Sequence, residues 1–200
     1  MEPQAEPTPP RHCDVLVIGG GPAGSTVAPL LAEMGYQVVL LDKARHPRFH
    51  IGESLLPANL PLFEKLGVAD EVRAIGMQKW GAEFVSPHHD HKQAFHFAEA
   101  WDKAMPYAYQ VKRAEFDTVL IRNAARKGVM VHEGCKVRAV DFLPDDDGAV
   151  VRTRHDDGRD GDADLAARPD PAPETADPLA DGLWRDHDGD VVALHGLGAG

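Results

Sequence analysis

Three glycines at fixed spacing carry the clearest chemical signal in this sequence. Gly19, Gly21 and Gly24 form a Gly-x-Gly-x-x-Gly pattern directly after the apolar run 13–18. At a strand–helix junction, the first glycine permits a tight turn, the second lets a diphosphate approach the backbone, and the third lets helix and strand pack closely. Phosphates then rest on free N–H groups at the positive end of the helix. The pattern therefore predicts a dinucleotide site.

An acidic residue follows at the distance that such a site requires. Asp42 comes about 20 positions after the first glycine and ends a second apolar run, 36–41. Its carboxylate can accept hydrogen bonds from ribose hydroxyls and would repel a 2′-phosphate, which disfavours NADP. The pattern alone does not separate NAD from FAD. The predicted dinucleotide contacts are Gly19, Gly20, Gly21, Pro22, Ala23, Gly24, Ser25, Asp42 and Lys43.

The elements that must position these residues form a βαβ unit. Strands are expected at 13–18 and 36–41, joined by a helix at 25–34 in which Pro29 predicts a bend or a weakened turn. The fold class is α/β, a Rossmann-like domain with a mixed sheet. Further elements are expected as helices at 55–66 and 114–126, a third parallel strand at 129–132, and hairpins at 83–85 with 94–97 and at 137–142 with 149–154.

Composition divides the chain into three parts. Residues 1–12 are Pro-rich and predicted to be a disordered leader, and 13–158 form the nucleotide-binding domain, which we expect to be partial. Residues 159–200 mix Asp, Ala, Pro and Gly without periodicity, apart from one short candidate strand at 191–194. An irregular tail is therefore expected. Its composition is what a shifted reading frame produces, and we interpret it as a frame-shifted or truncated end.

Charge and composition exclude several classes of protein. The formal net charge is −11, which argues against nucleic acid as a main partner. No stretch is apolar over a membrane-spanning length, and the first residues lack the hydrophobic segment of a signal peptide. The two cysteines, Cys13 and Cys135, are predicted to be free buried thiols. Together these features predict a cytoplasmic protein that does not contact membranes.

The segment after Asp42 resembles a known enzyme family. Residues 47–57, Pro-Arg-Phe-His-Ile-Gly-Glu-Ser-Leu-Leu-Pro, resemble the "GES" segment of flavin-dependent halogenases, with the best match to those that act on phenols and pyrroles. The stretch 109–117 resembles a second segment that this family shares with related flavin monooxygenases. The resemblance implies that the dinucleotide is FAD and that Arg48, Glu53 and Arg113 contact it.

A third stretch resembles the strand that carries the essential lysine of that family. Residues 78–82, Gln-Lys-Trp-Gly-Ala, match it, and Lys79 takes the place of the lysine. In the family, reduced FAD and oxygen convert chloride to hypochlorous acid, which the lysine holds and presents to an aromatic ring. A lysine can offer a neutral nitrogen or a compact donor, which an always-charged arginine cannot. The segment 78–110 is thus expected to begin a substrate-side region.

The resemblance also implies co-substrates and partners. These are chloride or bromide, a separate flavin reductase that supplies reduced FAD, and a small electron-rich aromatic substrate, free or bound to a carrier protein. Family members are longer, and their later motifs are not found here. Two alternatives stay open. One is a related FAD-dependent monooxygenase or reductase in which Lys79 is incidental, and the other is a non-catalytic dinucleotide-binding fragment.

A histidine group near residue 90 is the main competing signal. His88, His89, His91 and His96 surround Asp90, and such tracts can bind metal. Three of them fall in an expected hairpin turn without a helical i, i+4 pair or a cysteine partner, so a solvated turn is the favoured interpretation. No metal site is predicted.

Overall fold

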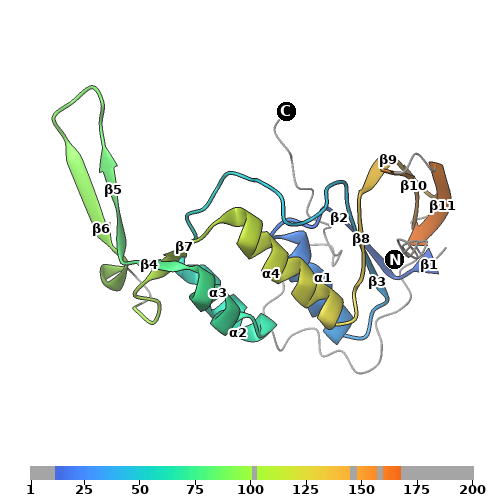
Figure 1. Cartoon of the computed structure of the whole chain (residues 1–200), viewed down its shortest axis with the longest axis horizontal. Coiled ribbons are helices and arrows are strands. Elements are labelled where there is room, and N and C mark those ends of the chain that lie inside the picture. The colour runs from blue at the N-terminus through green and yellow to red at the C-terminus, as the bar shows by residue number, and fades with distance from the viewer. Residues whose placement is uncertain (1–11, 101–102, 145–147, 157–159, 168–200) are drawn as a thin grey trace, which may run out of the picture. The chain divides into compact units, whose positions relative to one another are not determined.

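A computed structural model describes residues 12–100, 103–144, 148–156 and 160–167 (Figure 1). The chain divides into two compact units. The first comprises residues 1–46 and 121–200, and the second comprises residues 47–120. The predicted glycine-rich site belongs to the first unit and the predicted lysine site to the second.

A parallel three-stranded sheet forms the centre of the first unit. Its strands are β2 (Val15–Ile18), β3 (Val38–Asp42) and β8 (Met130–Glu133), in the order β2-β3-β8. Both strand pairs are parallel. The predicted βαβ unit and its third parallel strand are therefore confirmed.

Helix α1 (Gly24–Glu33) connects β2 to β3 and contains Pro29 in its interior. Leu31 of α1 packs with Val38 and Leu40 of β3. Helix α4 (Arg113–Arg126) contributes Ile121 to the same cluster. The two helices run side by side along this face of the sheet (Figure 1). Because side chains alternate along a strand, Val39 and Leu41 face the other way.

That other face packs against a second, mixed sheet. Its order is β1-β11-β10-β9, with β1 parallel to β11 and the other pairs antiparallel. Val39 and Leu41 form a cluster with Cys13, Cys135 and Val151. The strands of this sheet are β1 (His12–Cys13), β9 (Cys135–Phe142), β10 (Ala149–His155) and β11 (Asp160–Ala167).

Three expectations for the first unit are wrong in detail. The run 13–18 is not one strand, because the chain leaves the mixed sheet at Asp14 and enters the parallel sheet at Val15. The irregular segment expected from 159 onward instead begins with strand β11, which is held between β10 and β1. Its aspartates alternate with small or apolar residues, a strand period that the high acid content concealed. His12 likewise belongs to β1 rather than to the leader. Residues 1–11 and 168–200, with the candidate strand at 191–194, lie outside the described residues.

Both cysteines are buried and unbridged, as the sequence predicts. Burial, with a smaller contribution from the charge of Asp14, raises the pKa of Cys13 to about 11, and burial also raises the pKa of Cys135. The thiolate is the reactive form, so a thiol with a pKa near 11 carries roughly 100-fold less of it at pH 8 than one near 9. We expect Cys13 to react with a disulfide reagent at least that much more slowly in the native chain than in denaturant, and faster as the pH rises. Equal native and denatured rates would contradict this burial.

The second unit is built from short elements. The sequence predicts one helix at 55–66, but the structure divides it into a 3₁₀ turn, η1, and helix α2, because Pro61 lacks the N–H that a continuous helix would use. The predicted hairpin is confirmed, whereas the second helix, α3, was not anticipated. The elements are η1 (Pro57–Asn59), α2 (Leu60–Leu66), α3 (Ala69–Ile75), β4 (Met77–Lys79), β5 (Gly81–Val85), β6 (Lys92–His96), η2 (Phe97–Glu99) and β7 (Ala108–Gln110). None of the helices in the described residues is long and apolar enough to cross a membrane.

Candidate functional site

The glycine-rich loop lies between β2 and α1, as predicted. Gly19 has φ +108° and donates its N–H to the Leu41 carbonyl oxygen at 2.7 Å, which ties the loop to β3. A Cβ atom on Gly24 would lie 1.9 Å from the Gly19 carbonyl oxygen. Only glycine therefore allows α1 to begin this close to the strand end. A Cβ on Gly20 would lie 2.7 Å from the Ile121 side chain.

The first turn of α1 presents unused donors. Ser25 donates its N–H to the Gly21 carbonyl oxygen at 2.9 Å and its hydroxyl to the Gly20 carbonyl oxygen at 3.0 Å. Within the described part of the chain, no acceptor is recorded for the N–H groups of Gly21, Ala23 and Gly24. The first turn also contains no acidic side chain that would neutralise the positive end of the helix. This arrangement suits an anion such as a diphosphate.

Asp42 lies at the end of β3 beside this loop and is 5% exposed. Its Oδ2 accepts the N–H of Gly20 at 2.6 Å, and its Oδ1 accepts the N–H of Ala44 at 2.7 Å. Through these two hydrogen bonds, the Asp42 carboxylate holds the glycine-rich loop against the end of β3. Each carboxylate oxygen can accept more than one hydrogen bond, so the predicted ribose contact is compatible with these bonds and stays a prediction.

The segment after Asp42 is held by a pair that sequence reasoning missed. The backbone N–H of His46 donates to Glu133 Oε1 at 2.6 Å, and His46 Nδ1 lies 2.6 Å from the same oxygen. Glu133 ends β8 and stands opposite Asp42 in the parallel register. The signal that could have identified Glu133 is its position at the carboxyl end of the third parallel strand, where ligand-binding residues of such sheets lie. Lys43 is exposed, and its predicted cofactor contact stays untested.

In the second unit, Arg113 and Arg48 converge on one buried carboxylate. Arg113 forms a two-point contact with Asp117, Nε to Oδ1 at 2.7 Å and Nη2 to Oδ2 at 3.0 Å. Arg48 Nη2 lies 3.9 Å from Asp117 Oδ2, and the Asp117 side chain is fully buried. Arg113 Nη1 also donates to the Ile51 carbonyl oxygen at 2.7 Å. Arg113 therefore fixes the backbone of the GES-like segment at Ile51 as well as the start of α4.

Glu53 lies in that GES-like segment and is exposed. Its Oε2 accepts a hydrogen bond from Gln110 Nε2 at 3.4 Å. The neighbouring side chains of Phe49 and Ile51 are also exposed, at 86% and 78%. Exposed apolar side chains that lie next to polar ones are typical of ligand-binding or protein-binding surfaces. Whether Arg48, Glu53 or Arg113 contacts a cofactor stays a prediction.

Lys79 is the last residue of β4 and is half-buried. Its Nζ donates a hydrogen bond to the Ser54 hydroxyl and lies 5.7 Å from the centroid of the Phe97 ring. The Lys79 amine therefore has a specific oxygen partner in the GES-like segment. Sequence reasoning identified Lys79 but not Ser54.

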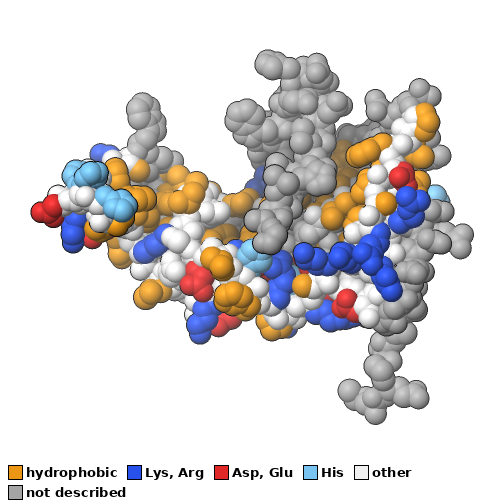
Figure 2. All heavy atoms as spheres, turned by 90° about the horizontal axis from the view of Figure 1, so that it is seen from above, with side chains coloured by type: hydrophobic (Ala, Val, Ile, Leu, Met, Phe, Trp, Pro, Cys, Tyr) orange, Lys and Arg blue, Asp and Glu red, His pale blue; other side chains and the backbone are white. Residues whose placement is uncertain are grey.

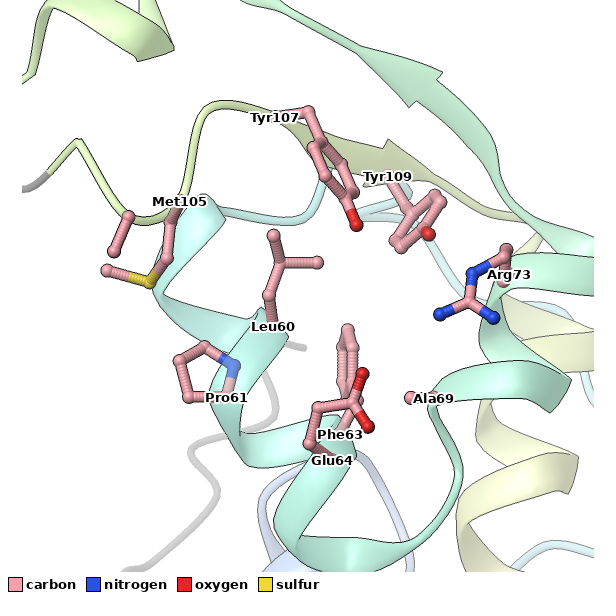
Figure 3. A pocket seen from close by; sticks show the side chains of 10 residues that line it. Leu60, Pro61, Phe63, Glu64, Ala69, Arg73, Met105, Tyr107 and Tyr109 are labelled. Atoms are coloured by element: carbon pink, nitrogen blue, oxygen red, sulfur yellow. The ribbon is translucent and has the colours of Figure 1, made fainter.

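A pocket of about 260 Å³ lies on the opposite face of the β4–β7 ribbon (Figure 3). Arg73 and Tyr107 each form a side-chain hydrogen bond with Tyr109. In each case this bond is the main cause that raises the pKa, of the Arg73 guanidinium and of the Tyr107 hydroxyl. Tyr109 pairs with Gln78, whereas Lys79 pairs with Ala108, so Lys79 and Tyr109 point to opposite faces. A ligand in this pocket would not meet Lys79 directly. The lining residues include Leu60, Phe63, Glu64, Arg73, Tyr107 and Tyr109.

The histidines gather on the β5–β6 hairpin (Figure 2). The turn is closed by Ser86, whose N–H donates to the His91 carbonyl oxygen at 3.1 Å and whose hydroxyl accepts the N–H of His89 at 3.2 Å. Among the described residues, no group of three or more His, Cys, Asp or Glu side chains is arranged to hold a metal ion.

Comparison with known proteins agrees with the site geometry. The family model for an FAD binding domain matches residues 12–168, which include the glycine-rich loop, the GES-like segment and Lys79. A tryptophan 2-halogenase from Chondromyces crocatus is 41% identical over 141 residues, which are 66% of this chain and 25% of that protein. The match to residue 168 also includes β11, in agreement with the structure.

Solved structures show the same resemblance. The myxobacterial chondrochloren halogenase CndH superposes with a TM-score of 0.66 and 42% identity over 75% of this chain and 35% of that one. A flavoprotein/dehydrogenase from Cytophaga hutchinsonii superposes with a TM-score of 0.67 and 36% identity, over 74% of this chain and 36% of that one. The chain thus spans about a quarter to a third of these relatives. It belongs to the FAD binding domain family and corresponds to the FAD-binding portion of the flavin-dependent halogenases.

Proposed function

We propose that the chain binds FAD and forms part of a halogenase that acts on an electron-rich aromatic compound. The observation that carries dinucleotide binding is the contact between Gly24 and Gly19, and the match of residues 12–168 to the FAD binding domain family supports FAD as the dinucleotide. At 1.9 Å from the Gly19 carbonyl oxygen there is no room for a Cβ, so α1 starts directly at the loop with its N–H groups exposed to an incoming diphosphate. The residues present therefore fit the cofactor.

The proposed roles of the individual residues follow from their positions. The N–H groups of Gly21, Ala23 and Gly24 bind the diphosphate, Ser25 stabilises the loop, and Asp42 accepts from the ribose. In the second unit, Arg48 and Glu53 are proposed as further cofactor contacts. Arg113 is proposed to position this cofactor-binding segment, because it holds Asp117, which also pairs with Arg48, and the Ile51 carbonyl oxygen two residues before Glu53.

Lys79 is proposed as the residue that presents the oxidised halogen. Bound reduced FAD, with oxygen and a halide, would supply the oxidant as a hypohalous acid. The Lys79 Nζ would hold this acid by a hydrogen bond and donate a proton to its oxygen. As the halogen passes to the aromatic ring, that oxygen leaves as water and the ring loses a proton. Lys79 suits this role because its amine already lies in a defined position, bonded to Ser54.

The proposed partners follow from this chemistry. The substrate is a small phenol or pyrrole, free or attached to a carrier protein, and the halide is chloride or bromide. A separate flavin reductase is proposed to supply the reduced FAD. The protein is proposed to act in the cytoplasm.

The proposed function is tested by product analysis. The protein is incubated with reduced FAD, oxygen, a phenolic or pyrrolic substrate, and either chloride or no halide, and the products are identified by mass spectrometry. We expect a chlorinated product that depends on chloride. A hydroxylated product that forms equally well without halide would show that the protein is a monooxygenase and would contradict the halogenase proposal.

The likeness to the flavoprotein/dehydrogenase favours one alternative, a related FAD enzyme with the same binding module. In that case FAD binds but the halide has no effect, and Lys79 is dispensable. Tight FAD binding without any product would instead indicate a non-catalytic binding module.

A further inference from the structure

Strand β7 lies between two neighbours that carry the key polar residues of the second unit. On one side it pairs with β4, with Met77 opposite Gln110 and Lys79 opposite Ala108. On the other side Ser54 forms a bridge with Gln110. Two hydrogen bonds close this bridge, Leu55 N–H to the Tyr109 carbonyl oxygen and Val111 N–H to the Glu53 carbonyl oxygen, each at 2.9 Å. The GES-like segment therefore lies along the free edge of β7, joined to it by a single antiparallel bridge at Ser54.

The register places Ser54 and Lys79 on one face of the β4–β7 ribbon. Residues directly opposite each other on antiparallel strands share a face, and residues two apart on one strand do so as well. Ser54 thus shares its face with Gln110, and Gln110 shares it with Ala108 and Lys79. The side chains of Ser54 and Lys79 therefore project from the same face and can contact each other.

The lysine must still cross a whole strand to reach the serine. Neighbouring strands lie about 4.8 Å apart, so β4 and the GES-like segment are separated by roughly 10 Å. Lys79 lies opposite Ala108 and Ser54 opposite Gln110, so the lysine chain begins its path across β7 beside Ala108, which is fully buried. A longer side chain there would stand in the path of the four methylene groups of Lys79. Because Ala108 is small, the lysine chain can lie across β7 and its Nζ bonds to Ser54.

We propose that Ser54 is a positioning residue for Lys79, which it holds over β7 with its amine beside Phe97. This inference rests on the proposed function, in which the Lys79 amine carries the reactive halogen. A serine hydroxyl accepts a hydrogen bond from an ammonium group and donates one to a neutral amine. Ser54 can therefore hold Lys79 in both protonation states, which a reaction that takes a proton from the amine requires. The two backbone hydrogen bonds, from Leu55 N–H and Val111 N–H, keep the serine-bearing segment against β7.

The experiment measures how reactive the Lys79 amine is, without any need for turnover. The intact chain is treated with trace acetic anhydride at several pH values, and acetylation of each lysine is followed by mass spectrometry. Lys136, exposed on β9 of the first unit, serves as an internal control. Ser54→Ala is expected to raise the acetylation rate of Lys79 about two- to tenfold, the factor that loss of one hydrogen bond produces. Lys136 is expected to be unaffected.

Two further variants test the geometry. Ser54→Thr keeps the hydroxyl and is expected to retain the slow acetylation of Lys79. Ala108→Val keeps Ser54 but obstructs the crossing, and is expected to raise the rate as Ser54→Ala does. If Ala108→Val does not fold by circular dichroism, the comparison of Ser54→Ala with Ser54→Thr decides alone. An unchanged Lys79 rate in Ser54→Ala, or the same rise in Ser54→Thr, overturns the positioning role.

The acetylation result is separable from the proposed function. If Ser54→Ala changes the Lys79 rate but Lys79 is dispensable for product formation, the contact stands and the halogenase proposal fails. If the Lys79 rate does not change, Ser54 has no positioning role whatever the product assay gives.

Discussion

Lys79→Ala is expected to abolish halide-dependent product formation while FAD binds with unchanged affinity. Lys79 lies on β4 and is none of the proposed FAD contacts, most of which, the glycine-rich loop and Asp42, belong to the first unit. The substitution removes the amine that is proposed to hold the oxidant and to donate a proton to it. Such a positioned side chain contributes about 10²–10⁴-fold to a proton transfer. Product formation should fall by that factor, as measured by mass spectrometry.

Two comparison variants make this result specific. Lys79→Arg keeps the positive charge, but its guanidinium is larger and always protonated, so we expect it to be nearly as inactive as Lys79→Ala. Lys136→Ala removes an exposed lysine from the first unit and is expected to retain full activity. If Lys79→Ala forms chlorinated product at the rate of the unaltered protein, the proposal that halogenation proceeds through this lysine is wrong.

Gly24→Ala is expected to weaken FAD binding at least about tenfold and to destabilise the chain by roughly 1–3 kcal/mol, the usual cost of overpacking. In most helices a glycine-to-alanine change instead stabilises by about 1 kcal/mol. The sign reverses here because the new Cβ would lie 1.9 Å from the Gly19 carbonyl oxygen and 3.1 Å from the Val17 side chain. The loop must move away from the first turn of α1. Thermal unfolding and a flavin fluorescence titration measure the two effects.

A second glycine provides the control for this variant. Gly128 also belongs to the first unit, and a Cβ there would contact nothing within 4 Å. Its φ of +93° makes Gly128→Ala mildly destabilising through the backbone alone. We expect that variant to bind FAD normally. Native affinity in Gly24→Ala would show that the close approach of helix and loop is not what binds the dinucleotide.

The βαβ unit could be predicted because local chemistry determines it. An apolar strand, a glycine-rich turn and a helix each have a distinct period or residue requirement, and the three follow one another over residues 15–33. The same holds for α4 and the two hairpins. Asp42 was identifiable from its spacing, and its hydrogen bond to Gly20 N–H shows that it supports the loop.

The remaining features depend on contacts between distant segments. Strand β11 is stabilised by pairing with β10 and β1, and its acidic sequence gives little apolar signal. Ser54 bonds to Lys79 only because β7 brings two segments together across the ribbon. The pair of His46 and Glu133 joins residues 87 positions apart. Register and pairing partners of this kind follow from tertiary structure, and no local pattern specifies them.

A competition titration tests the FAD assignment most directly. Purified chain is titrated into FAD while flavin fluorescence is followed, and the bound flavin is then challenged with either ADP or FMN. If the glycine-rich loop of the first unit binds the diphosphate and Asp42 the ribose, FAD binding saturates and ADP displaces FAD, whereas FMN, which lacks the adenosine half, does not. No saturable binding, or displacement by FMN and not by ADP, would contradict this assignment.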